Sequence, residues 1–334
     1  MSALVLLPAA ARAGNDDGVL IGNPAAMTGG AVVATVDDGS ALWYNPAGIG
    51  RVTTHSADVT ASVMALRYYR SPDLVRGVGT EAAEDVVEFL SIPSALSYVR
   101  PLSETVHIGL GVFSPAASDI VFRSDLDTQR MGVEGKLSLA SVDTESRYVG
   151  VLGIGWTPHP TFRVGLAFRG GYSSTFSTFQ SSLRFTDATT DWVTADADTT
   201  SSRLGDFGFT LGVAWDPISQ LSFCVSVETP SVALVGFTRV SSISVFAETS
   251  PDGTFIDGEN TDDGSLDAQA DVLEPAKVRM GAAYRLERGR VEVNVDLLMP
   301  LLSENLGIDR HLQANVRVGG VHEIGDGLEL GVGL

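Results

Sequence analysis

The sequence predicts an all-β fold: a transmembrane, antiparallel, up-and-down β-barrel. Three features support this prediction: apolar residues that alternate with small or polar ones, short and long connections that alternate along the chain, and the lack of a long apolar run. No stretch reaches the roughly 18 consecutive apolar residues of a membrane-spanning helix. A closed β-barrel crosses a bilayer without such a run, because neighbouring strands satisfy each other's backbone hydrogen bonds.

Composition narrows the classes of function. The chain has 334 residues, with 22 Lys and Arg against 41 Asp and Glu, and its net charge is −19. A nucleic-acid partner is therefore not expected, since a phosphate backbone requires a basic surface. The single Cys224 excludes an intramolecular disulfide and a multi-cysteine zinc site. No motif calls for a metal or a cofactor.

Residues 1–13 are predicted to be the end of a secretory signal peptide. Leu4 to Leu7 form a short apolar core, and Ala11-Arg12-Ala13 is an A-x-A cleavage pattern. A basic region before the apolar core is missing, so the true start is expected upstream.

Residues 14–50 are predicted to form a compact, irregular unit that precedes the strands. Its most distinctive part is Trp43-Tyr44-Asn45-Pro46-Ala47-Gly48. Pro46 lacks an N–H and restricts Asn45, so neither a helix nor a central strand can continue through this stretch. A surface turn before the first strand is the alternative interpretation.

Residues 51–334 are predicted to form the barrel. In residues 205–216, every odd position from Phe207 to Trp215 is large and apolar, and the residues between are small. A period of two over about ten residues is typical of a half-buried strand. The candidate strands are residues 52–70, 92–100, 105–114, 147–157, 161–175, 205–216, 220–230, 274–287, 290–299, 311–324 and 326–334.

The connections favour a barrel over a soluble β-sandwich. Short turns are predicted at residues 100–105, 157–161, 216–220, 287–290 and 323–327, and long polar connections at residues 71–91, 115–146, 176–204, 231–273 and 300–310. One long connection is expected to hold a helix from Glu81 to Leu90, capped by Thr80. An outer-membrane barrel has tight periplasmic turns and long outside loops, whereas a Greek-key sandwich has no reason to separate loop lengths in this way.

The stretch Asp38-x-Ser40-Ala41-x-Trp43-Tyr44-Asn45-Pro46-Ala47-Gly48 resembles the hatch motif of the FadL/TodX-type outer-membrane transporters of fatty acids and other hydrophobic compounds. It also lies where that family has its hatch, after a Gly/Ala-rich segment and just before the first strand. Residues 93–115, 205–229 and 274–298 resemble strand pairs of the family, so the resemblance covers nearly the whole chain.

The resemblance implies a passive channel in the outer membrane of a Gram-negative bacterium, not an enzyme. Residues 14–50 would be a hatch inside the barrel lumen, with a site made of Trp43, Tyr44, Asn45, Pro46, Ala47 and Gly48. The implied ligand is a hydrophobic small molecule, a long-chain fatty acid first and an aromatic hydrocarbon second. It would leave sideways through the barrel wall. A monomer surrounded by outer-membrane lipid and lipopolysaccharide is implied.

The candidate for the sideways exit is Phe113-Ser114-Pro115, because a proline cannot donate to a strand ladder. An ordinary strand end before a loop is the alternative. The family has more strands than the eleven predicted here, and the chain stops within the last one. We therefore expect the barrel to be incomplete, with its last strands missing. An odd number of strands would also prevent the first and last strands from pairing antiparallel.

Two other functions remain as alternatives to a hydrophobic-compound channel. The first is a general porin or a structural barrel, and the second is a soluble exported β-sandwich for binding or adhesion. A hydrolase is not expected, because the five histidines accompany no Gly-x-Ser-x-Gly motif.

Overall fold

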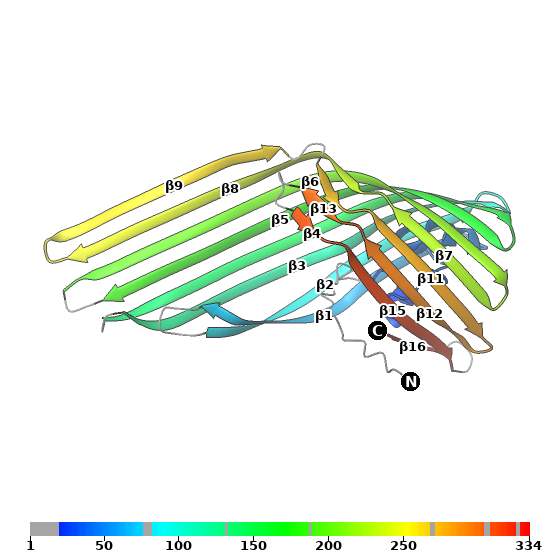
Figure 1. Cartoon of the computed structure of the whole chain (residues 1–334), viewed down its shortest axis with the longest axis horizontal. Helices are drawn as coiled ribbons and strands as arrows, with labels where there is room; N and C mark the ends of the chain where they lie inside the picture. The colour runs from blue at the N-terminus through cyan, green and yellow to red at the C-terminus, as the bar shows by residue number, and fades with distance from the viewer. Residues whose placement is uncertain are drawn as a thin grey trace, which may run out of the picture.

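The structure is a computed structural model, and it describes residues 20–75, 82–130, 133–186, 189–267, 271–303, 308–324 and 328–334. The predicted signal peptide, residues 1–13, lies outside the described residues, as does the part of segment 14–50 before residue 20. The described residues form short helices followed by a large antiparallel sheet (Figure 1). The helices are α1 (Asn23–Met27), α2 (Ala41–Tyr44) and the 3-10 helix η1 (Pro46–Arg51). The strands are β1 (Ser56–Val75), β2 (Ala82–Pro101), β3 (Val106–Arg130), β4 (Val133–His159), β5 (Phe162–Thr186), β6 (Asp191–Ile218), β7 (Leu221–Glu228), β8 (Ser231–Ser250), β9 (Gly253–Asp267), β10 (Val272–Glu274), β11 (Lys277–Leu286), β12 (Gly289–Leu298), β13 (Leu301–Ser303), β14 (Ile308–Arg310), β15 (Gln313–Glu323) and β16 (Glu329–Gly333).

The main sheet follows the chain from one edge to the other. Its hydrogen-bonded path is β1-β2-β3-β4-β5-β6-β7-β11-β12-β15-β16, and every neighbouring pair on it is antiparallel. This path has eleven strands, as predicted. In the described part of the chain its end strands, β1 and β16, do not pair with each other, as expected for an odd number of antiparallel strands.

Strand β6 is shared by two partners, which makes the sheet branch. β7 pairs with the end of β6 that leads into the short turn (Thr210–Ile218), and β8 pairs with the other end (Asp191–Phe207). β9 and β10 then pair with β8, while β13 and β14 form a separate two-stranded ribbon. The hairpin β8–β9 therefore extends the sheet far beyond β7 (Figure 1).

The alternation read from the sequence gives the two faces of the sheet. In β4, Leu152 and Trp156 are each 54% exposed, whereas Val149 and Val151 between the exposed positions are buried. β5 repeats the pattern, with Leu166 exposed and Ala167 buried. We call the face with the exposed apolar residues the outward face and the opposite one the inward face.

Most of the predicted long loops are strands. Residues 115–146, 176–204 and 231–273 continue as paired hairpins, with β3 and β4 in register up to Arg130 and Val133. We call these parts the strand extensions. Their Ser, Thr and Asp content indicated loops, but every backbone N–H and C=O along them finds a partner more readily in a two-stranded ladder than in a long irregular loop.

The predicted helix from Glu81 to Leu90 is also wrong. From Ala82 onward this stretch belongs to β2, where Val87 pairs with Tyr68 and Leu90 with Ala65 of β1. The spacing of its apolar residues is typical of a helix. This stretch is a strand because its pairing with β1 outweighs the local preference for a helix.

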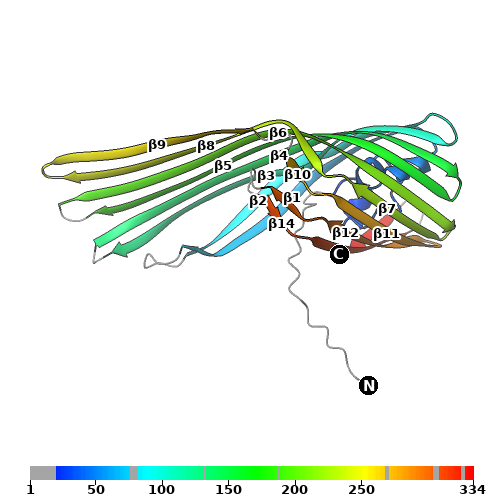
Figure 2. The ribbon, with the colours of Figure 1, turned by 45° about the horizontal axis from the view of Figure 1, so that its top comes forward.

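The described N-terminal residues lie on the inward face of the sheet (Figure 2). We call residues 20–52 the N-terminal segment. The first strand contacts it, because Gly39 N donates to Asp58 Oδ2 of β1 at 3.0 Å. The last strand contacts it too, because Gly331 and Gly333 of β16 lie against Met27 and Thr28. Contacts from both edge strands mean that the sheet curves around this segment, and the hydrophobic core lies between the two.

Candidate functional site

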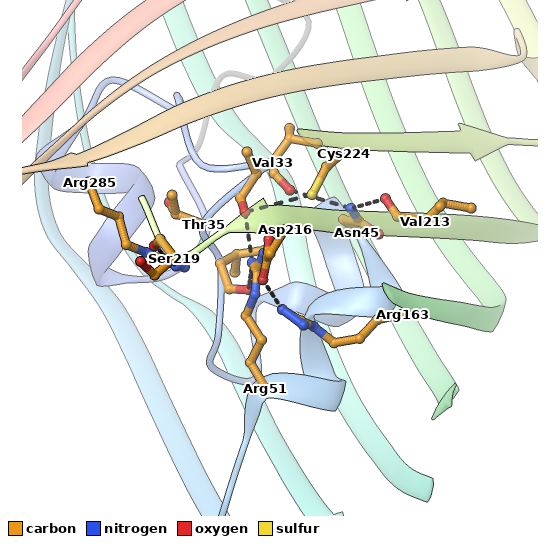
Figure 3. Close-up of polar contacts among 12 residues, drawn as sticks. Val33, Thr35, Asn45, Arg51, Arg163, Val213, Asp216, Ser219, Cys224 and Arg285 are labelled. Carbon is orange, nitrogen blue, oxygen red and sulfur yellow. Dashed lines mark hydrogen bonds and ion pairs between the residues drawn. The ribbon is translucent and has the colours of Figure 1, made fainter. Parts of the chain in front are cut away.

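The turn at Asn45 is built locally and then tied to the sheet. Asn45 caps η1, because its Oδ1 accepts a hydrogen bond from Ala47 N at 3.1 Å, and Pro46 occupies the first turn, where no N–H is needed. Asn45 Nδ2 donates to Val33 O at 3.4 Å and to Val213 O of β6 at 3.3 Å (Figure 3). One buried side chain thus joins two parts of the N-terminal segment to the sheet, which we call the wall.

Glycines of the wall leave room for this turn. At Gly165 of β5 a Cβ atom would collide with the backbone of Pro46 and Ala47, and at Gly212 of β6 it would collide with Asn45 Oδ1. At Gly155 of β4 it would lie 2.6 Å from Ile49. The small residues that alternate with large ones in these strands therefore form the surface on which the segment lies.

Buried charges hold the end of the segment. Arg51 Nη2 lies 3.1 Å from Asp216 Oδ1, and Arg163 of β5 makes an ion pair with the other carboxylate oxygen (Figure 3). Arg51 Nη1 also donates to Ala34 O at 2.7 Å. A single carboxylate at the end of β6 therefore binds one arginine from the segment and one from the wall.

Strand β12 holds the segment from the opposite side. Glu292 is buried and accepts hydrogen bonds from Ala34 N at 2.7 Å and from Thr35 Oγ1 at 2.5 Å. The adjacent inward residue, Asn294, donates to Gly30 O at 3.3 Å. Together with the contacts to β5 and β6, these bonds fix the segment to two distant parts of the sheet.

Trp43 lies in a mixed aromatic and ionic environment. Its ring centroid is 5.6 Å from that of Phe113, and the guanidinium carbon of Arg169 lies 4.0 Å from its ring centroid. Arg169 and Arg279 both make ion pairs with Glu228, and Arg279 Nη1 donates to Trp43 O at 3.3 Å. The cation–π contact and the ion pairs fix the indole between β3 and the charged residues of β5, β7 and β11.

Tyr44 and Asp38 stabilise the segment internally. Tyr44 Oη accepts a hydrogen bond from Ile21 N at 3.0 Å. Asp38 Oδ1 accepts bonds from Ser40 N at 2.9 Å and Ser40 Oγ at 2.5 Å. Burial raises the pKa of the Asp38 carboxyl, and the two bonds from Ser40 oppose that rise.

Phe113, Ser114 and Pro115 lie where two strands separate. β2 and β3 pair only from Ala95–Phe113 to Pro101–His107 in the described residues, although both strands continue beyond this ladder. From there β2 pairs with β1 and β3 with β4, and a β-bulge interrupts the β3–β4 ladder between Phe113 and Ala116. Phe113 and Ser114 are buried, and Ser114 Oγ has no hydrogen-bond partner among the described residues.

The structure thus brings together two sets of residues that the sequence suggested separately, because Trp43 of the hatch motif touches Phe113 at the strand separation. Sequence reasoning missed the charged residues that hold the segment: Arg51, Asp216, Glu228, Arg279 and Glu292. Charged residues at inward positions of apolar strands were the available signal, but their partners come from other strands.

Helices that could span a membrane are not found among the described residues. The described His, Cys, Asp and Glu side chains also form no group of three that could hold a metal ion.

Two solved channels resemble this structure. The CymD monoaromatic hydrocarbon channel matches with a TM-score of 0.50 and 10% identity, over 90% of this chain and 79% of that chain. The P. putida toluene transporter TodX matches with a TM-score of 0.59 and 12% identity, over 88% of this chain and 78% of that chain. The sequence matches no protein-family model and no curated protein. The chain therefore has the fold of the hydrophobic-compound channels CymD and TodX, in agreement with the resemblance of its hatch motif.

Proposed function

We propose that the chain is a passive channel for hydrophobic small molecules in the outer membrane of a Gram-negative bacterium, with no catalytic step. The observation that carries the proposal is the combination of an apolar outward face with an N-terminal segment held on the inward face. The fold of CymD and TodX supports it.

The outward face suits lipid. From Trp156 to Tyr148 in β4 and from Phe162 to Tyr172 in β5, every outward residue is apolar, aromatic or glycine. Eight to ten residues at about 3.3 Å each, on strands tilted by roughly 40°, span about 20–25 Å, the height of the apolar band of an outer-membrane barrel. Aromatic residues at both ends of this band correspond to the two interfacial girdles. A soluble protein rarely exposes so large an apolar surface.

The N-terminal segment would act as a hatch. Its bonds to β1, β6 and β12 hold it on the inward face of the sheet, where it would block water and ions. A general porin needs an open lumen, which this arrangement disfavours.

The separation of β2 from β3 is our proposed exit. An open ladder provides a gap between strands without breaking hydrogen bonds, and Phe113 and Trp43 give that gap an aromatic lining. A hydrophobic molecule would move from outside to this lining and pass sideways into the membrane. CymD and TodX are named for monoaromatic hydrocarbons and toluene, so an aromatic hydrocarbon is the first ligand to test and a long-chain fatty acid the second.

Uptake measurements test the proposal. Gram-negative cells that lack their own hydrophobic-compound channels should take up labelled toluene or oleate faster when they express the chain. Ser114→Trp should block the gap and bring uptake close to the vector level. Val112→Trp, on the exposed outward face of the same strand, should leave uptake unchanged. Equal uptake by wild type and vector would refute the channel, while normal uptake by Ser114→Trp would refute only the exit.

A further inference from the structure

The strand extensions, which run away from the N-terminal segment (Figure 2), carry a groove of about 430 Å³. This volume is in the usual range of a ligand site. Ten of the residues that line the groove form two adjacent rows of directly paired positions across β3, β4, β5, β6 and β8. One row is Arg123, Ala140, Gln180, Ala197 and Ile243, and the other is Asp125, Ser138, Ser182, Ala195 and Val245. We call these ten residues the outer groove.

Both rows belong to the outward face. In β5, Gln180 and Ser182 lie eight and ten residues beyond Tyr172, and an even number of residues returns a strand to the same face. The ladders that join β5 to β4 and β6 have no register shift between these positions. The outer groove is therefore on the side of the sheet that carries the apolar band, and not on the side that holds the N-terminal segment.

The outer groove lies well beyond the apolar band. At about 2.5 Å of height per residue on a tilted strand, its two rows are about 20–25 Å above Tyr172, where the band of β5 ends. Lipid headgroups occupy only about 5–8 Å on each side of the hydrocarbon core. In an outer membrane, the part of the lipid that reaches farther is the saccharide chain of lipopolysaccharide. The height of the groove therefore favours sugars over acyl chains and over the phosphates of lipid A.

Small side chains form the floor of the outer groove. On β4, β5 and β6, five of its six residues are alanine or serine, and Gln180 is the sixth. Arg123 on β3 and Ile243 on β8 stand at the two ends. Neighbouring strands are about 4.8 Å apart, so the five strands give a length of about 19 Å. This shape suits an extended chain molecule that lies across the strands.

The charges in and beside the outer groove balance. Arg123 and Asp125 are its two charged residues. In the rows on either side, followed as far as β9, two charged residues are basic and two are acidic: Lys136, Arg184, Asp127 and Asp262. Asp125 is also bound within the protein, because its Oδ1 accepts a hydrogen bond from Ser138 Oγ at 2.5 Å. A ligand without net charge is therefore favoured over a phosphate.

Polar side chains of the outer groove are available to bind sugar hydroxyls. Arg123 and Gln180 are exposed, and neither has a hydrogen-bond or ion-pair partner among the described residues. The guanidinium offers five donors, and the amide offers two donors and an acceptor. A sugar carries hydroxyl groups around a ring whose faces are C–H groups. The alanines of the floor can pack against those faces while Arg123 and Gln180 bind the hydroxyls.

We propose that the outer groove binds the neutral sugars of lipopolysaccharide in the outer leaflet. The proposal rests on the proposed function only for the orientation of the chain, with the strand extensions outside the cell. Height, shape and balanced charge select the same ligand. The bound saccharide would hold the strand extensions at the membrane surface.

Binding of core oligosaccharide, freed from lipid A and from its phosphates, to the purified full chain in nanodiscs tests the groove. Ala197→Trp fills the floor and should abolish binding measured by calorimetry. Gln180→Ala removes hydrogen bonds without filling the floor and should weaken binding by about fivefold. The matched control is Ala314→Trp, because Ala314 is an exposed outward alanine of β15, away from the groove. This control should bind like wild type, and lipid A alone should not compete.

Unchanged binding by Ala197→Trp, an equal loss in Ala314→Trp, or competition by lipid A would overturn the proposal. Competition by toluene would overturn it too, because it would assign the groove to the transported compound. Wild-type dimers that Ala197→Trp abolishes would assign the groove to a second copy of the chain instead. Toluene uptake separates the two proposals: unchanged oligosaccharide binding by Ala197→Trp with normal uptake would reject the groove and leave the channel intact.

Discussion

Substituting Gly165 by alanine should loosen the N-terminal segment. A Cβ atom at Gly165 would collide with the backbone of Pro46 and Ala47, which cannot turn aside as a flexible side chain can. Overpacking of this kind costs about 1–3 kcal/mol. Such a cost would raise the fraction of molecules with a detached turn by about five- to 150-fold.

Gly170 provides the matched control, because it lies on the same strand and meets only Phe168 at 3.9 Å. Replacing a strand glycine by alanine without a clash should be neutral or stabilising by up to about 1 kcal/mol. The two substitutions should therefore have opposite signs.

Hydrogen exchange of the full chain in nanodiscs measures the difference. Gly48 N donates to Asn45 O at 2.9 Å, so its exchange reports opening of the turn. Gly165→Ala should accelerate that exchange and raise ion conductance in planar bilayers, whereas Gly170→Ala should do neither. Equal exchange in the two variants would refute the assigned contact between the segment and the wall.

Three further predictions concern the hatch and the membrane band. Asn45→Ala should destabilise the segment by about 1 kcal/mol for each of its three hydrogen bonds, seen as faster exchange. Asn45→Asp keeps the cap but loses both donors, so wild-type exchange in that variant would contradict the contact with Val213. Leu152→Arg should impair insertion into bilayers by about 2–4 kcal/mol, whereas Ala140→Arg, on the same face of β4 but beyond the band, should insert normally. Burial raises the pKa of the Asp38 carboxyl, so the folded segment favours the protonated carboxyl. The stability that this preference contributes is fully present below the unfolded pKa and is lost as pH rises through the folded pKa, so the segment should loosen as pH rises. Asp38→Asn should abolish this loosening above the ordinary aspartate pKa of about 4, as measured by exchange of the Leu42 amide, and an unchanged pH response would exclude Asp38 as its cause.

The positions of strands can be predicted best from the sequence where one face of the strand is apolar. Residues 161–175 and 205–216 each show a period of two, because lipid-facing and segment-facing positions differ in polarity. The strand extensions lack this contrast, since polar and apolar residues are mixed on both of their faces, and Ser177 and Asp143 occur on the inward face. Their paired structure follows from partners farther along the chain, which composition does not reveal.

The turn of the candidate site can also be predicted from the sequence. The Asn45-Pro46 pair specifies a turn by local chemistry, and the structure ties that turn to β6. The charged contacts are different. Arg169 stands out as an inward arginine, but its partner Glu228 comes from a strand that is not its neighbour in the sheet. Such pairs depend on the curvature of the whole sheet, so no local pattern indicates them.

A disulfide that locks the N-terminal segment tests the central claim, that the segment stays in place while hydrophobic molecules leave sideways. Ala34 Cβ lies 3.2 Å from the position of a Cβ atom at Gly281 of β11, close to the roughly 3.5–4.5 Å of a disulfide. The same Cβ atom would lie 2.7 Å from Asn294 Oδ1, so the end of the Asn294 side chain has to turn aside. Ala34→Cys with Gly281→Cys, in a Cys224→Ala background, should therefore cross-link the segment to the wall. We predict that the oxidised protein in liposomes still admits toluene and stays closed to ions. Loss of toluene entry on oxidation, with recovery on reduction, would contradict the account.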